Sequence, residues 1–225
     1  MSQESKFKDS TNLTLWLKRS LYATIAISII GVISSALEYQ LLNNFQKGVY
    51  AFQEDLAVAA GESNDTREGA VGIIQIIVFL ITGVLYLRWI YRANSNARSL
   101  GATGMRFTPG WSIGFHFIPI MNLWKPYQAM KEIWKASANP DNWHEHIVPP
   151  LLPWWWFFWL GTNFTAHIAF RLALRSVEEA EALSYLITSN FFSIISSVLN
   201  IVLCFIGIAI VGRVHEMQMS HISRA

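Results

Sequence analysis

Four long apolar runs limit what this chain can fold into. Each is long enough to cross about 30 Å of hydrocarbon as a helix that rises about 1.5 Å per residue. The composition agrees, because 52% of the residues are hydrophobic and 14% are charged, whereas roughly a quarter are charged in soluble domains. The sequence therefore predicts an all-α, polytopic integral membrane protein with four transmembrane helices, at about 21–42, 70–91, 150–170 and 190–212.

The basic residues predict how these spans are oriented. Lys and Arg near the ends of spans are retained in the cytoplasm, and acidic residues have little influence. With four spans, 13 of the 17 basic residues lie on one side. If residues 109–124 crossed as well, the division would be ten to seven. We therefore predict a multi-pass protein of the cell membrane with both termini in the cytoplasm: a tail at 1–20, a four-span domain at 21–212 and a tail at 213–225.

Residues 109–137 are apolar but do not fit a fifth span. A helix from Gly110 to Ile118 would extend about 13–14 Å, less than half of the hydrocarbon core. Pro119 disfavours continuation of that helix. From Leu123 onward the pattern is amphipathic, so we expect a re-entrant half-helix, a turn at Pro119 and a helix in the cytoplasmic interface. The apolar face of that helix comprises Leu123, Tyr127, Met130, Ile133 and Trp134, and its polar face comprises Gln128, Lys131, Glu132 and Lys135.

One part of this region has a recognisable sequence. The run FIPIMNLWKPYQAMKEIW, with RANSNARSLGATGMRF before it and PLLPWWWFFWLGTN after it, resembles the bacterial membrane family known as domain of unknown function 4328. The resemblance covers most of the chain from the second span to the fourth. It implies a polytopic domain in a bacterial inner membrane, and it implies no activity, substrate or catalytic residue.

Polar side chains at membrane depth are candidates for function, because hydrocarbon offers them no hydrogen-bond partner. They are Gln75, His116, Asn122, Asn163, His167 and Asn200. Two interpretations stay open. These side chains either join helices by hydrogen bonds, or they line a polar cavity that the re-entrant segment caps. The second interpretation describes a small oligomeric transporter or channel.

Basic residues at the cytoplasmic end of the second span and between the second and third spans are candidates for binding lipids or partners. Each charge near an anionic leaflet contributes roughly 1 kcal/mol of attraction. The candidates are Arg88, Arg92, Arg98, Arg106, Lys125, Lys131 and Lys135. We expect a non-enzymatic membrane module that acts through membrane lipids, a second copy or a membrane-protein partner. Nucleic acid is not expected as a partner, since the basic residues are spread along the plane of the bilayer.

Patterns typical of catalysis are incomplete. Gly110–Gly114 matches G-x-S-x-G, but the strand that precedes this motif in hydrolases is not expected here. An intramembrane hydrolase with Ser112 and a base, His116 or His167, is therefore a remote alternative, as is a haem between those two histidines. His144 and His146 share a face only in an extended chain. We accordingly predict no catalytic residue, no metal site and no cofactor.

Overall fold

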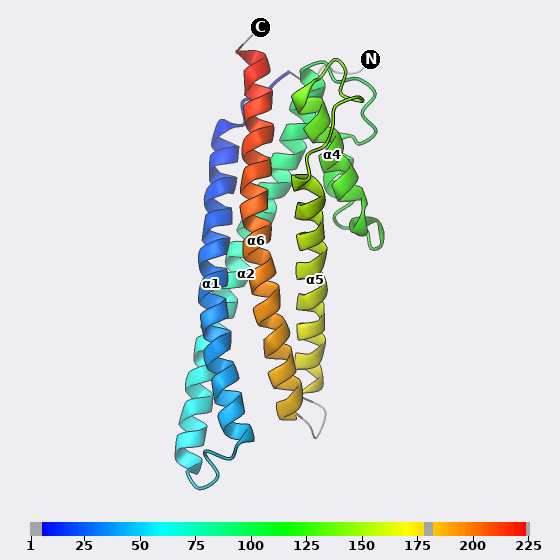
Figure 1. Ribbon diagram of the computed structural model, residues 1–225. Helices are drawn as coiled ribbons and strands as arrows, with labels where there is room; N and C mark the ends of the chain where they lie inside the picture. The colour runs from blue at the N-terminus through cyan, green and yellow to red at the C-terminus, as the bar shows by residue number, and fades with distance from the viewer. Residues whose placement is uncertain (1–5, 178–181, 224–225) are drawn as a thin grey trace. The chain divides into compact units, whose positions relative to one another are not determined.

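The computed structural model describes residues 6–177 and 182–223, and within them the chain is helical without any strand. The all-α prediction is confirmed for these residues. Figure 1 shows the four long helices and the shorter α4. The elements are α1 (Thr11–Gln46), α2 (Glu54–Ser99), α3 (Pro109–Gly114), the 3-10 helix η1 (Met121–Leu123), α4 (Lys125–Ala138), α5 (Leu151–Arg175) and α6 (Ala182–Ile222).

Three of these helices, α1, α2 and α6, are long and apolar enough to cross a membrane. The length and hydropathy of these helices are therefore those of a membrane protein. α5 covers the span predicted at 150–170 and has 25 residues, which is a sufficient length. It is not among those three, since its four Trp residues together with Asn163 and His167 lower its hydropathy.

The helices extend beyond the predicted spans. α1 begins within the predicted N-terminal tail, where the carboxylate of Asp9 accepts a hydrogen bond from the backbone N–H of Thr11 at 2.8 Å. α2 begins with Glu54 and Asp55 in its first turn, where acidic side chains stabilise a helix. α2 therefore starts well before the span predicted at 70–91. α6 runs to Ile222 and includes most of the predicted C-terminal tail.

The chain forms two compact units, and all four long helices contribute residues to both. The first unit comprises the described residues of Met1–Tyr22, Leu80–Phe157 and Phe205–Ala225, and the second comprises Ala23–Phe79 and Phe158–Cys204. The largest fully buried side chains, among them Trp89, Ile133 and Leu152, all belong to the first unit. The first unit is therefore the one with a dense core.

The second unit keeps apolar side chains on its surface. On α2, Ile73, Ile76 and Phe79 are 62%, 61% and 71% exposed. Large exposed apolar surfaces of this kind mark contact with a membrane or a partner. The side chains that are buried in this unit include polar ones, namely Ser34, Asn64 and Asn190.

Candidate functional site

Two polar side chains of α2 hold the loop that leads into α3. The side-chain amide of Asn94 donates hydrogen bonds to Phe107 O and to Ser112 Oγ, both at 2.9 Å. The guanidinium of Arg98 donates to Asn94 Oδ1 at 3.1 Å and to the carbonyl oxygens of Met105 and Phe107, both at 2.9 Å. Arg98, which we predicted to bind lipids or partners, is therefore engaged inside the first unit.

Glu132 of α4 holds the same loop from the other side. Its Oε2 accepts the backbone N–H groups of Arg106 at 3.0 Å and of Phe107 at 3.2 Å. The prediction that Glu132 lies on a solvated polar face was wrong, because only 8% of the residue is exposed. Burial raises the pKa of Glu132 above its ordinary value, although both backbone hydrogen bonds act to lower it. The backbone of Phe107 is thus fixed at its N–H and at its carbonyl oxygen.

The first turn of α4 and three residues of its apolar face agree with the sequence prediction, whereas Leu123 lies in η1 and is 53% exposed. Pro126 lies in the first turn, where a missing amide hydrogen costs no intrahelical bond. Met130, Ile133 and Trp134 of the predicted apolar face are buried, whereas Lys131 is exposed. This packing fixes α4 in the first unit.

The segment before α4 contains the predicted turn. α3 has only six residues, and the side chain of Thr108 caps it by accepting the backbone N–H of Trp111. At the turn, the N–H of Met121 donates to Pro119 O at 2.7 Å. Ile120 between them has φ 66° and ψ −56°. The chain therefore reverses at Pro119 through a tight three-residue turn.

The loop before α3, α3 itself and the start of α4 border a pocket of about 190 Å³, which we call the basic–aromatic pocket. Lys125 Nζ lies 5.6 Å from the ring centroid of Phe107 and 5.8 Å from that of Phe115. The rings of Trp111 and Phe115 stack with centroids 5.0 Å apart. The pocket is lined by Arg106, Phe107, Trp111, Phe115 and Lys125.

Within the described residues neither cation of this pocket forms an ion pair, although the charge of Arg106 acts to lower the pKa of Glu132. Among the described residues, the ion pairs are Arg67–Glu68 and Arg213–Glu216. Arg106 and Lys125 therefore carry positive charge into a pocket whose other walls are aromatic. Such a pocket attracts an anion that also has an apolar part.

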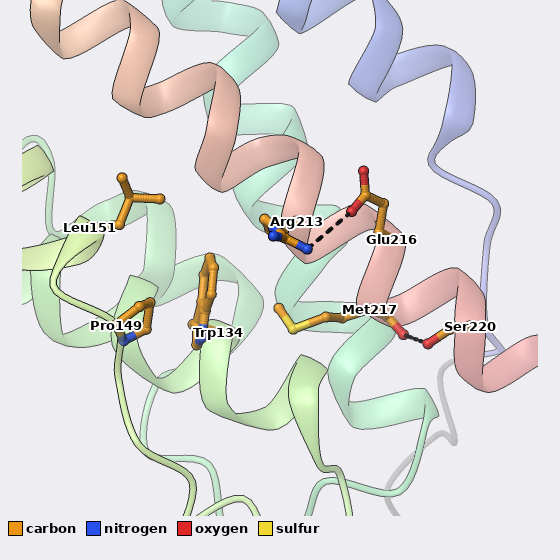
Figure 2. A pocket seen from close by; sticks show the side chains of 7 residues that line it. All are labelled: Trp134, Pro149, Leu151, Arg213, Glu216, Met217 and Ser220. Carbon is orange, nitrogen blue, oxygen red and sulfur yellow. Dashed lines mark hydrogen bonds and ion pairs between the residues drawn. The ribbon is translucent and has the colours of Figure 1, made fainter.

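A second pocket in the first unit is larger, about 570 Å³, and we call it the Arg213 pocket. Figure 2 shows the side chains of Arg213 and Glu216 directed toward each other, with Arg213 Nη1 3.9 Å from Glu216 Oε2. Because its cation faces a carboxylate, this pocket does not favour an anion. Its lining residues are Trp134, Pro149, Leu151, Arg213, Glu216, Met217 and Ser220.

Comparison with known proteins identifies the family of this chain. The family model described as domain of unknown function (DUF4328) matches residues 53–216. The chain belongs to this family. The resemblance predicted from the sequence is thereby confirmed. No curated protein and no solved structure matches the chain. The DUF4328 match includes every residue of the basic–aromatic pocket.

The DUF4328 domain brings only two of the predicted basic residues, Arg106 and Lys125, into one pocket. Lys135 Nζ donates to His144 O at 3.0 Å and thereby fastens the loop after α4. Arg88, Arg92 and Lys131 line neither pocket. Sequence reasoning missed the aromatic walls, although a signal was present: Phe107, Trp111 and Phe115 recur every four residues.

None of the six predicted cavity residues lines either pocket. Asn200 Nδ2 donates to Ser28 Oγ at 3.2 Å and joins α6 to α1. The side chain of Gln75 packs so closely against Gly31 that a Cβ at Gly31 would clash with its Nε2. These two contacts favour the interpretation that polar residues join helices.

The other four cavity candidates have separate environments. The His116 ring lies edge-on to Tyr86 with centroids 5.6 Å apart. The buried Oδ1 of Asn122 has no hydrogen-bond partner in the described chain. Asn163 Nδ2 donates to Trp159 O at 2.8 Å on its own helix. Asn163 and His167 are both exposed on α5.

Ser112 is not accessible for chemistry. It is 0% exposed, and its Oγ donates to Thr108 O at 3.1 Å while it accepts from Asn94. Nδ1 of His116 lies 3.2 Å from Ile113 O. Residues 6–177 and 182–223 contain no group of three or more His, Cys, Asp and Glu side chains that could hold a metal ion.

Proposed function

We propose that this protein is a four-span module of the cell membrane that binds the headgroup of an anionic lipid in the basic–aromatic pocket. The observation that carries the proposal is the convergence of two cations on three aromatic rings. Arg106 and Lys125 are the cations, and within the described chain neither forms an ion pair. An anionic headgroup supplies the charge that they lack.

The chemistry of the pocket suits a lipid phosphate. The Arg106 guanidinium offers a planar set of donors that matches phosphate, and the Lys125 ammonium adds a point charge. The two rings beneath Lys125 hold its ammonium by cation–π attraction, at 5.6 and 5.8 Å. Trp111 is 53% exposed, and exposed Trp side chains favour the level of the headgroups. In the proposed complex the phosphate binds the two cations and the apolar part of the lipid lies along Trp111.

The proposed arrangement in the membrane has α1, α2, α5 and α6 as spans and both termini in the cytoplasm. As a helix, the 25 residues of α5 extend about 37 Å, enough for the hydrocarbon core. The six residues of α3 extend about 9 Å, so the segment that contains them enters and returns on one side. The division of basic residues, 13 to 4, supports this orientation, which places the pocket at the cytoplasmic leaflet.

Lipid binding is tested with the purified full-length protein in detergent, by titration with phosphatidylglycerol and with phosphatidylcholine under native mass spectrometry. We expect selective binding of phosphatidylglycerol. Two charges at about 1 kcal/mol each predict that Arg106→Gln with Lys125→Gln weakens this binding about 30-fold. The matched control, Arg88→Gln with Lys131→Gln, removes the same charge outside the pocket and should retain the selectivity. Equal binding of both lipids, or equal losses in both double variants, would refute the lipid site.

The arrangement in the membrane is tested separately by single cysteines in a Cys204→Ser background. Ser63, Thr103 and Asn139 are exposed, so a cysteine at each is accessible from its own side. An impermeant thiol reagent outside intact cells should label Ser63→Cys and should not label Thr103→Cys or Asn139→Cys. Labelling of Asn139→Cys without Thr103→Cys would mean that the segment between them crosses the membrane.

A further inference from the structure

Four exposed side chains of α5 form a row at heptad spacing. Asn163, His167, Phe170 and Leu174 follow one another at intervals of four, three and four residues, the spacing of a coiled-coil seam. All four are exposed, with Phe170 at 62% and Leu174 at 54%. They belong to one helix and to the second unit. We call this row the α5 seam.

The polar members of the seam do not suit contact with lipid. This step rests on the proposed function, in which α5 crosses the membrane. With the span ending near residue 170, Asn163 lies about 10 Å inside the hydrocarbon. Polar and ionisable side chains at such depth normally face another helix, because lipid cannot hydrogen-bond them. In the described chain both side chains are instead exposed, and the Asn163 amide bonds only within α5, to Trp159 O.

We propose that α5 packs against α5 of a second copy of this protein, in parallel and in register. Two copies inserted in the same direction place Asn163 opposite Asn163 and His167 opposite His167, at equal depth in the membrane. A carboxamide and a neutral imidazole each offer a donor and an acceptor, so each pair can hydrogen-bond across a two-fold axis. A polar residue in such a seam fixes the register of parallel helices.

The positions beside the seam agree with a close parallel pair. Ala166 and Ala173 occupy one flank, and small residues let two membrane helices approach each other. Arg171 occupies the other flank. In a parallel pair the two flanks face each other across the seam, so Arg171 meets an alanine flank rather than a second arginine. A second copy therefore satisfies the polar seam without opposing like charges.

Disulfide cross-linking in native membranes tests the pair. Single cysteines at Asn163, His167, Phe170 and Leu174, in a Cys204→Ser background, should yield a linked dimer on mild oxidation. Phe164→Cys is the control for helix phase, because Phe164 is 68% exposed and lies beside the seam. Ile73→Cys on α2 is the control for random collision, because Ile73 is 62% exposed, as Phe170 is. Linking at either control as strong as at the seam, or no linking at any seam position, would overturn the proposed pair.

A second measurement follows the strength of association. Asn163→Leu removes the paired amides and should raise the dimer dissociation constant in micelles about three- to thirty-fold, as expected for a hydrogen bond between membrane helices. Ile73→Leu on α2, an exposed position outside the seam and its flanks, is the control and should leave the constant unchanged. An unchanged constant for Asn163→Leu would contradict a role for Asn163 in the pair.

Failure of the proposed pair and failure of the proposed function give different experimental results. Loss of selectivity for phosphatidylglycerol concerns the basic–aromatic pocket and leaves the seam unaffected. If an impermeant thiol reagent labels Asn163→Cys, α5 is not buried in the membrane and the basis of the pair is removed. If Asn163→Cys is shielded and still does not cross-link, α5 crosses the membrane and only the second copy is refuted.

Discussion

The side-chain amide of Asn94 donates a hydrogen bond to Ser112 Oγ at 2.9 Å, and both residues are 0% exposed. Ser112 Oγ donates in turn to Thr108 O at 3.1 Å. The serine of the G-x-S-x-G sequence thus ties the start of α3 to the end of α2. A buried serine with both bonds made within the fold is a structural residue, and the motif here is not that of an accessible nucleophile.

Ser112→Ala should destabilise the protein. The substitution leaves the buried amide of Asn94 with one acceptor fewer, which costs about 1–2 kcal/mol. The measurement is the free energy of unfolding in micelles, followed by Trp fluorescence. Ser223→Ala is the control, since Ser223 is exposed and its Oγ bonds to Ser220 O in the same turn, and we expect a change within about 0.5 kcal/mol. Equal effects of the two substitutions would contradict this role for Ser112.

Glu132 should make stability depend on pH. Burial raises the pKa of its carboxyl in the folded state, so the folded protein binds this proton more tightly than the unfolded chain does. The stability that Glu132 contributes is therefore full below the ordinary glutamate pKa and is lost as the pH rises through the raised pKa.

Glu132→Gln tests this dependence, because glutamine keeps an acceptor for the amides of Arg106 and Phe107 but does not titrate. The unfolding free energy of the variant minus that of the wild type should increase between about pH 4 and pH 7. The measurement is unfolding in micelles at a series of pH values. A difference that stays constant, or that decreases with pH, would contradict the prediction.

The local features of the sequence predicted the local features of the fold. Helical periodicity placed Met130, Ile133 and Trp134 on one face of α4, and they are buried. Pro119 predicted the reversal before η1, because a proline acts on its immediate neighbours. The long apolar runs likewise predicted α1, α2 and α6 as helices that could cross a membrane.

Contacts between residues far apart in the chain could not be predicted from periodicity or hydropathy. Glu132 follows an exposed lysine and matches a polar face, but its partners are amides 25 and 26 residues earlier. Arg98 belongs to a group of basic residues that periodicity treats alike, yet its guanidinium is engaged by carbonyl oxygens seven and nine residues later. At the start of α1 the carboxylate of Asp9 accepts the N–H of Thr11, a contact that hydropathy does not register. Hydropathy reports only the part of a helix that matches the membrane.

Arg98→Lys should destabilise the first unit although it keeps the charge. The guanidinium reaches Asn94 Oδ1 and two carbonyl oxygens, and an ammonium cannot reproduce that planar fork. We expect a loss of about 1.5–3 kcal/mol in the free energy of unfolding. Because Arg98 also fixes Phe107, binding of phosphatidylglycerol should weaken.

Arg92→Lys is the matched control for Arg98→Lys. Both substitutions preserve the positive charge that orients the spans, and Arg92 is half-buried outside both pockets. We expect its unfolding free energy to stay within about 0.5 kcal/mol of the wild type. Equal losses in the two variants would mean that the fork of Arg98 contributes nothing specific.

Ile120→Gly should stabilise the protein. Ile120 has φ 66° and ψ −56°, and a β-branched residue in the left-handed region stores about 1–3 kcal/mol of strain. Glycine relieves this strain at a cost of roughly 0.5–1 kcal/mol in chain entropy, and little burial is lost because Ile120 is 71% exposed. The net gain expected is up to about 2 kcal/mol in the free energy of unfolding in micelles. Ile120→Ala is the matched control, since alanine keeps the Cβ and therefore most of the strain. A glycine variant no more stable than the alanine variant would show that the turn at Pro119 is not strained at this residue.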